Sequence, residues 1–202
     1  AVGTITAGAG TVNADSFDNT VISGHTALAV PPATTDEFLI SDAGTIKRID
    51  FSLLGNAPSF QARLSANQSL SDDSFTKLQF NTEEYDTNSA YDNSSNYRFT
   101  VPSNLAGKYL IYVAVTIDSE TNSNLDSANV TIYRNGSAHP NGGLEYYMLS
   151  NPPRFVPITH SLVIELSATD YVEVYARIEA SDASGGRVSQ NATFGGYKLI
   201  GI

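Results

Sequence analysis

The residues with the clearest capacity for chemistry are the carboxylates of the stretch "DSETNSNLD", which contains Asp118, Glu120 and Asp126. Carboxylate, amide and carbonyl oxygens are the ligands that Ca²⁺ prefers in proteins. The stretch is therefore a candidate calcium site, although its spacing matches no EF-hand loop. The alternative is a solvated acidic loop, which is the commoner meaning of such a run. A second acidic pair, Asp72 and Asp73, is expected to be plain surface.

Histidines are the other residues that could support catalysis, and the chain has His25, His139 and His160. His25 falls in a segment poor in large apolar residues. His139 is expected in a loop beside Pro140, and His160 at the start of a predicted strand. The sequence contains no Gly-x-Ser-x-Gly motif, no His-Glu-x-x-His motif and no glycine-rich phosphate loop. Serine and aspartate are so frequent that a Ser/His/Asp trio drawn from them would carry no information. We predict that the protein is not an enzyme and has no catalytic residues.

The charge of the chain excludes several classes of partner. The net charge is −10, and no tract of lysine and arginine interrupts the acidic composition. Binding to a phosphate backbone requires clustered basic residues, so nucleic acid is not an expected partner, and neither is an anionic membrane surface. No apolar run approaches the roughly 18 residues of a membrane-spanning helix. The absence of cysteine excludes disulfides and thiolate metal sites.

The elements that must position these residues are short strands. Between Pro58 and the end of the chain, about nine apolar segments are separated by turn signals, among them Asn135-Gly136 and Asn141-Gly142. This pattern predicts an antiparallel sandwich or jelly roll. In residues 171–180, Val172 and its alternate neighbours are expected to face the core. Glu173, Arg177 and Glu179 are expected on the wet face.

The segment before Pro58 differs from the rest, so the sequence predicts two parts, residues 1–57 and 58–202. In the first part, "DEFLIS" and "TIKRIDFSLL" are predicted strands joined by the turn "DAG". Large apolar residues are too sparse in residues 1–57 for a core of its own. We expect this segment to be stable only when copies wrap together or when it lies on a partner.

One predicted strand, "GKYLIYVAVTID", is apolar on both faces. Tyr109 and every second residue to Ile117 form one apolar face, and Leu110, Tyr112 and Ala114 form the other. The first face can fill the core of a sandwich. The second face requires another cover, most simply a neighbouring subunit. The alternative is that a loop or the N-terminal segment covers it.

The spacing of aromatic residues adds a resemblance to a known family. The chain from Ser59 to Ile202 resembles the C1q-like domains, which belong to the tumour necrosis factor-like jelly rolls. The last strand, "TFGGYKLIGI", is similar to the family's closing strand. One extra residue before Phe99, two extra before Gly107, and aliphatic Ile111 and Val113 in place of aromatics depart from the family pattern. The residues that carry the signature are Phe80, Asp86, Tyr91, Phe99, Gly107 and Tyr109.

The resemblance implies a jelly roll of about ten strands that assembles as a compact homotrimer. The family's central Gly-x-Tyr strand lies near the three-fold axis, which implies that Leu110, Tyr112 and Ala114 form the trimer interface. Some members of the family bind calcium near the apex of the trimer, which would suit the stretch at Asp118.

The N-terminal segment is similar to segments of tail-fibre and other appendage proteins of marine phages. Both resemblances together predict a trimeric appendage on the virion surface, attached through residues 1–57 to a neighbouring virion protein, with a tip that binds a host-surface glycan or protein. The alternatives are a capsid decoration protein without a receptor and a secreted bacterial C1q-like adhesin.

If the head binds a receptor, loops at one end of the jelly roll are the expected contacts, because core and interface occupy the sandwich faces. The candidate loops are residues 86–96, 118–127 and 180–191, which are rich in Asn, Ser, Asp and Gly. The alternative is that they are solvated connections. Tyr146 and Tyr147 could stack on a sugar, but we expect them in the core or the interface.

Overall fold

The computed structural model describes residues 26, 29–30, 32–33, 35–55, 57–148 and 150–199. The chain divides into two compact units, residues 1–52 and 53–202. The boundary therefore falls between Ser52 and Leu53, whereas the sequence analysis places it between Ala57 and Pro58. His25 lies outside the described residues. No helix in the described ranges is long and apolar enough to cross a membrane.

The described part of the first unit is a β-hairpin, followed by the 3-10 helix η2 (Phe51–Leu54). Strands β1 (Glu37–Asp42) and β2 (Thr45–Asp50) pair antiparallel, as the sequence predicts. Ala43 and Gly44 both have positive φ, which is the backbone of a tight two-residue hairpin turn. Arg48 Nε lies 2.9 Å from Glu37 Oε1 across the ladder. Leu39 is 78% exposed, so within its own unit the hairpin leaves apolar surface in water.

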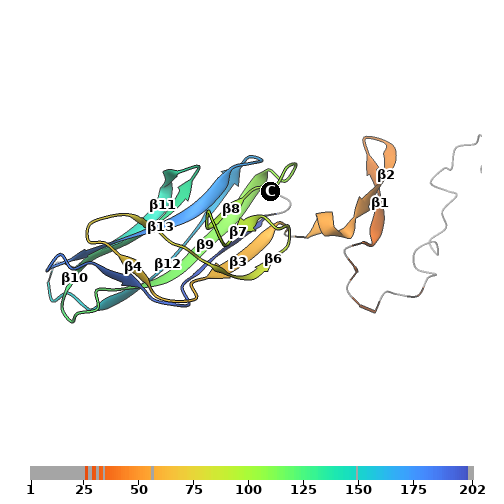
Figure 1. Cartoon of the computed structure of the whole chain (residues 1–202). Coiled ribbons are helices and arrows are strands. Elements are labelled where there is room, and N and C mark those ends of the chain that lie inside the picture. The colour runs from red at the N-terminus through yellow and green to blue at the C-terminus, as the bar shows by residue number, and fades with distance from the viewer. Residues whose placement is uncertain are drawn as a thin grey trace, which may run out of the picture. The chain divides into compact units, whose positions relative to one another are not determined.

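The second unit, here called the head, is an all-β antiparallel sandwich with the jelly-roll architecture that the sequence predicts (Figure 1). It has more strands than expected because several short segments pair as well. Their bounds are β3 (Ser59–Arg63), β4 (Gln68–Leu70), β5 (Thr76–Lys77), β6 (Thr82–Asp86), β7 (Tyr91–Asp92), β8 (Arg98–Thr100), β9 (Gly107–Asp118), β10 (Leu125–Arg134), β11 (Ser137–Tyr147), β12 (Phe155–Leu166), β13 (Tyr171–Ala180), β14 (Gly186–Val188) and β15 (Thr193–Lys198).

The strands form two sheets. In the first sheet the order is β4-β14-β9-β15-β3-β6. The strands β14 and β15 pair with successive parts of one edge of β9, and β12 pairs with its other edge. In the second sheet the order is β11-β10-β13-β8-β7, with β5 also paired to β13. The strand β9 thus lies inside the first sheet next to its edge strand β12, and β13 is central in the second sheet. Both sheets bury one face in a shared core, as alternation of side chains along a strand requires.

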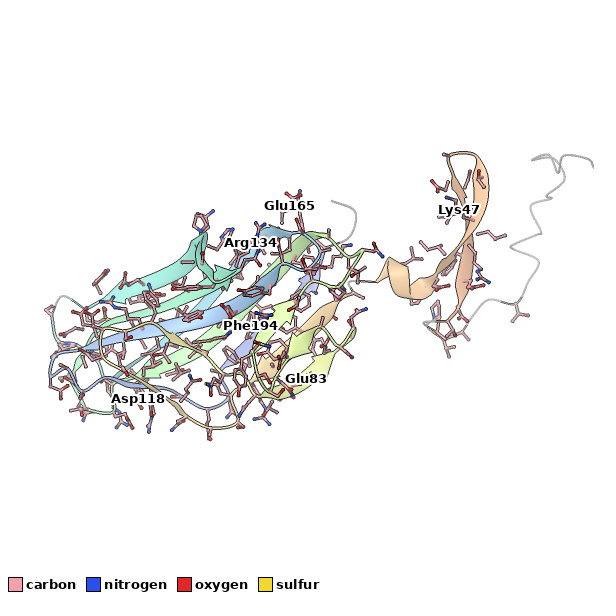
Figure 2. All side chains as sticks on the ribbon, turned by 45° about the horizontal axis from the view of Figure 1, so that its top comes forward. Lys47, Glu83, Asp118, Arg134, Glu165 and Phe194 are labelled. Carbon is pink, nitrogen blue, oxygen red and sulfur yellow. The ribbon has the colours of Figure 1, made fainter. Side chains whose placement is uncertain are left out.

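The core is built around stacked aromatic rings. Phe60 lies with its ring centroid 4.6 Å from that of Phe99 and 5.1 Å from that of Tyr91, nearly parallel to both. Phe194 meets Phe60 edge-on at 5.0 Å, and Figure 2 shows Phe194 between the two sheets. Aromatic pairs in such geometries contribute about 0.5–1.5 kcal/mol beyond their buried area. Rings from β3, β7, β8 and β15 therefore tie the two sheets together.

The six signature residues take structural positions around this core. Phe80, Phe99 and Tyr109 are fully buried, and Tyr91 is nearly so. The Tyr91 hydroxyl donates to the Phe80 carbonyl at 3.0 Å, and burial raises the pKa of Tyr91 far above its usual value. Asp86 accepts a hydrogen bond from the Tyr91 backbone N–H at 2.7 Å. Gly107 has a φ of 150°, which favours glycine, and an added Cβ would lie 3.0 Å from Lys198.

The second sheet follows the predicted alternation, with one correction. Val172, Val174 and the alternate residues that follow them are buried against the core. Glu173 lies on the outward face but is itself buried, because Lys77 of the neighbouring β5 forms an ion pair with its carboxylate. The outward face of β13 is therefore not uniformly wet. The alternation of β13 alone could not reveal this, because the covering side chain comes from a strand that is far away in the sequence.

Candidate interaction surface

The outward face of the first sheet is the strongest candidate surface, and we call it the β9 face. Leu110 of β9 stands opposite Tyr197 of β15 and Val163 of β12. Tyr112 stands opposite Gly195 and Ser161 in the same way. Directly opposed residues of an antiparallel ladder share a face, so an apolar patch runs across β12, β9 and β15.

Tyr112 is the centre of the β9 face. A Cβ added to Gly195 would overlap the Tyr112 phenol, so the ring lies across the glycine of the neighbouring strand. The Tyr112 hydroxyl donates to Gln61 Oε1 at 2.8 Å, which fixes the ring flat on the sheet. Burial, together with the nearby Tyr85 and Tyr197, raises the pKa of Tyr112 to about 12. Tyrosines from three strands thus converge at one point.

Large apolar side chains on this face are open to water in the isolated head. Val163 is 53% exposed and Phe155 is 59% exposed, and both belong to the outward-facing set of β12. Leu110, Tyr112 and Ala114 are half-buried, and part of that cover comes from one another and from β15. No loop in the described part of the head covers Val163 or Phe155. Val163 stands opposite Leu110, whereas Phe155 stands opposite Asp118 near the other end of β12. Large apolar side chains exposed on a sheet face, as at Val163 and Leu110, are typical of interaction sites.

A depression in the β9 face lies beside this patch. It is lined by Ala114, Thr116, Pro157 and Thr159 from β9 and β12, and by residues 190–192 before β15. Its floor is the ladder between β9 and β12, where Ala114 pairs with Thr159. Small side chains leave this hollow, and a protruding side chain of another molecule could fill it.

The carboxylate stretch predicted as a calcium candidate is a salt-bridge network. Asp118 Oδ1 lies 2.9 Å from Arg154 Nε, and Asp118 Oδ2 lies 2.9 Å from Arg187 Nη2. Glu120 Oε1 accepts from Arg187 Nη1 at 2.8 Å, and Asp126 instead accepts from the Ser181 hydroxyl. Figure 2 places Asp118 at the end of the sandwich away from Glu165.

The electrostatics of Asp118 do not fit a calcium ion. Burial opposes ionisation of its carboxyl, but hydrogen bonds from Arg154, the Glu120 backbone and Arg187 hold its pKa below the usual range. Two guanidinium groups beside the carboxylate would repel a divalent cation. Within the described ranges, no three acidic or histidine side chains are grouped to hold a metal. The ion pairs of Asp118 therefore connect the C-terminal end of β9 to the residue before β12 and to β14.

The three candidate loops do not share one end of the head, which corrects the expectation of a single binding end. Residues 118–127 and 180–191 lie together, since Asn124 Nδ2 donates to Asp182 Oδ1 at 2.9 Å. Residues 86–96 precede β8, whose Thr100 pairs with Tyr171 at the opposite end of β13 from Ala180. In that loop, Asp92 accepts hydrogen bonds from the backbone of residues 94–96, which hold its pKa low.

The tyrosine pair at the end of β11 is exposed, so the expectation of a core position is wrong for these residues, and the expectation of an interface position stays a prediction. Tyr147 is 64% exposed and Tyr146 is also open to solvent. Both residues pair with β10, and β11 is the edge strand of the second sheet. His139 lies within β11 and His160 within β12, and a ring nitrogen of each contacts the backbone of Asn141, which also lies in β11.

Comparison with known proteins supports the fold. No protein-family model matches the sequence, and no curated protein matches it. The globular domain of zebrafish complement 1qA protein matches with a TM-score of 0.50 and 15% identity, over 71% of this chain and 98% of that one. A crystal structure of murine APRIL at pH 5.0 matches with a TM-score of 0.50 and 15% identity, over 70% of this chain and 98% of that one. At these identities the likeness shows the fold alone: the head is a C1q/TNF-like jelly roll.

Sequence reasoning missed a group of side chains on the outward face of the second sheet. Tyr133 of β10 and Tyr175 of β13 lie with their ring centroids 4.1 Å apart, and Phe75 lies 6.4 Å from Tyr133. The alternation of β13 places Tyr175 on the same face as Glu173 and could have signalled this group. Phe75 begins the segment "FTKLQFN", which the sequence favours as a strand, but no local pattern places its ring beside Tyr133 of a distant segment.

Proposed function

We propose that the chain is a homotrimeric, non-enzymatic binding protein of a virion appendage, in which the head recognises a receptor on the host surface. The observation that carries the trimer is the β9 face. It presents Leu110, Tyr112 and Ala114 on a strand inside a sheet, with the exposed Val163 opposite Leu110 on β12. A three-fold arrangement in which each β9 face meets a neighbouring head would remove this surface from water.

The arrangement leaves the rest of the head available for a receptor. The two loop ends and the outward face of the second sheet lie away from the β9 face in the topology of the sandwich. In this proposal the N-terminal part, residues 1–57 by the sequence prediction, attaches the trimer to a neighbouring virion protein. The exposed apolar side chains of the hairpin β1–β2 support that role, because a lone two-stranded hairpin is marginally stable in water.

Three measurements on the full chain test the proposal. Light scattering should give the mass of three chains at micromolar concentration. Antibodies against the purified chain should label density-purified virus particles from the source culture, and added chain should reduce adsorption of those particles to host cells. A monomeric mass would contradict the trimer. Labelled particles with unchanged adsorption would support a capsid decoration protein instead, and chain found only in the cell-free supernatant would support a secreted adhesin.

A further inference from the structure

The outward face of the second sheet carries an unusual combination of side chains, which we call the aromatic ledge: Phe75, Tyr133 and Tyr175. Phe75 is 45% exposed, although it stands beside polar neighbours and outside the core. Its ring lies 6.4 Å from that of Tyr133, tilted by 59°. Tyr133 in turn lies 4.1 Å from Tyr175 at 32°. Three aromatic rings from the loop before β5 and from two adjacent strands are thus collected on one face.

The polar groups around the aromatic ledge are held in fixed positions. Lys77 pairs in register with Tyr175 and forms an ion pair with the buried Glu173 carboxylate. The Tyr175 hydroxyl lies 3.5 Å from Glu173 Oε1. Thr131, opposite Tyr175 on β10, donates to Asn129 Oδ1 at 2.6 Å. Because regular strands and mutual hydrogen bonds orient these side chains, a ligand would meet them preorganised.

The charge of this face disfavours an anionic ligand. Beside Tyr175, Arg177 is surrounded by Asp73, Glu145 and Glu179, with Arg177 Nη1 3.0 Å from Glu145 Oε1 and Arg177 Nη2 3.6 Å from Glu179 Oε2. Together with Glu173, four carboxylates accompany the two cations Lys77 and Arg177. The cations are already paired. The four carboxylates outnumber the two cations, and this surplus of negative charge would repel sulfated or uronic acid chains.

We propose that the aromatic ledge binds a neutral glycan chain; this inference rests on the proposed receptor-binding function and names its ligand class and its site. A pyranose ring presents an apolar face of C–H groups, which stacks on Phe75 and Tyr133, and a rim of hydroxyls. Those hydroxyls donate to carboxylates such as Glu145, because a carboxylate has about four acceptor sites and can accept from a sugar hydroxyl as well as from Arg177.

The inference locates recognition on a sheet face and not on the loop ends. In the two loops that contain Asp118 and Asp182, these carboxylates accept hydrogen bonds from other groups of the head. Asp92 likewise spends its oxygens on the backbone of its own loop. The aromatic ledge instead keeps a large apolar ring in water, at a cost in stability that ligand contact would offset.

The test uses the full chain and titrates it with neutral gluco-, manno- and galacto-configured oligosaccharides by saturation-transfer NMR and calorimetry. A heparin oligosaccharide serves as the anionic comparator. At least one neutral oligosaccharide should bind, with saturation transfer to the faces of its sugar rings. Phe75→Ser should weaken this binding at least roughly tenfold, the loss expected when a stacked aromatic ring is removed. Tyr133→Ser should do the same.

Phe38→Ser is the matched control, because Phe38 is a phenylalanine of similar exposure, 41%, in the other unit. This variant should keep full affinity. The inference is overturned if none of the neutral oligosaccharides binds, if only heparin binds, or if Phe75→Ser leaves the affinity unchanged while the variant remains folded by circular dichroism. A trimer that still blocks adsorption would, in those cases, preserve the proposed function and remove only this site.

Discussion

Tyr112 lies across Gly195 of the neighbouring strand, and the two residues fit only because the glycine has no side chain. A Cβ at position 195 would overlap the Tyr112 phenol and lie 2.9 Å from the Phe60 carbonyl oxygen. The hydroxyl that closes this arrangement donates to Gln61 on the next strand. One tyrosine thereby spans three strands and sets the shape of the β9 face.

Gly195→Ala should therefore destabilise the head. The added methyl group would push Tyr112 off the sheet or strain the ladder between β15 and β3, at a cost of about 1–3 kcal/mol. Urea unfolding followed by circular dichroism measures the change. Gly55→Ala is the control, because an added Cβ there meets nothing within 4 Å. Equal stability of the two variants would show that the Tyr112 ring has room to move.

Tyr112→Glu should dissociate the trimer while the sheets stay folded. A carboxylate in the centre of the β9 face would be buried without a partner in the assembly, which costs several kcal/mol. Light scattering should show the mass falling from three chains to one, with an unchanged β-sheet signal in circular dichroism. Tyr147→Glu makes the same replacement at an exposed position of the second sheet and should leave the mass unchanged. A trimeric Tyr112→Glu variant would move the interface elsewhere.

The sequence predicted the fold well because alternation along strands is local information. The apolar set from Tyr109 to Ile117 identified the core side of β9, and the aromatic spacing identified the jelly roll. The Asn141-Gly142 pair was expected as a turn, yet it lies inside β11, beside a register shift against β10 between Thr131 and Tyr133. Gly142 is needed there because a Cβ would overlap the Ile132 carbonyl.

The side-chain contacts of Asp118 and Glu173 were harder to predict, because their partners are far away in the sequence. Asp118 meets Arg154 and Arg187, and no local pattern announces those contacts. The alternation of β13 predicts that Glu173 is exposed to solvent, but β5 brings Lys77 into an ion pair with it. A list of acidic residues therefore suggested a metal, whereas the folded chain brings arginines to the same place.

The Asp118 network should make stability depend on pH in the acid range. Because the folded state holds the Asp118 pKa below its usual value, the stabilisation is complete above the unfolded pKa of about 4 and is lost as the pH falls through the folded value. Asp118→Asn should lower the free energy of unfolding at pH 7 by about 1.5–3 kcal/mol, the range for hydrogen bonds to charged groups.

The difference between Asp118→Asn and the parent should shrink in urea titrations as the pH is lowered from 7 toward 3. Asp73→Asn is the comparison, since Asp73 pairs with Arg177 at the surface, where ion pairs contribute about 0–1 kcal/mol. If the Asp118→Asn deficit stays constant down to pH 3, the carboxylate charge is not its cause.

The hairpin β1–β2 should depend on other molecules for its stability. Its strands pair along their whole length, and Phe38 and Phe51 pack with ring centroids 6.0 Å apart, but Leu39 stays exposed. A two-stranded hairpin with so little buried surface is marginal in water. A peptide of residues 35–52 should show no cooperative melting by circular dichroism. Deleting residues 1–52 should leave the head a folded trimer and abolish its incorporation into particles. A cooperatively melting peptide, or a truncated chain still carried on particles, would refute an attachment role for this segment.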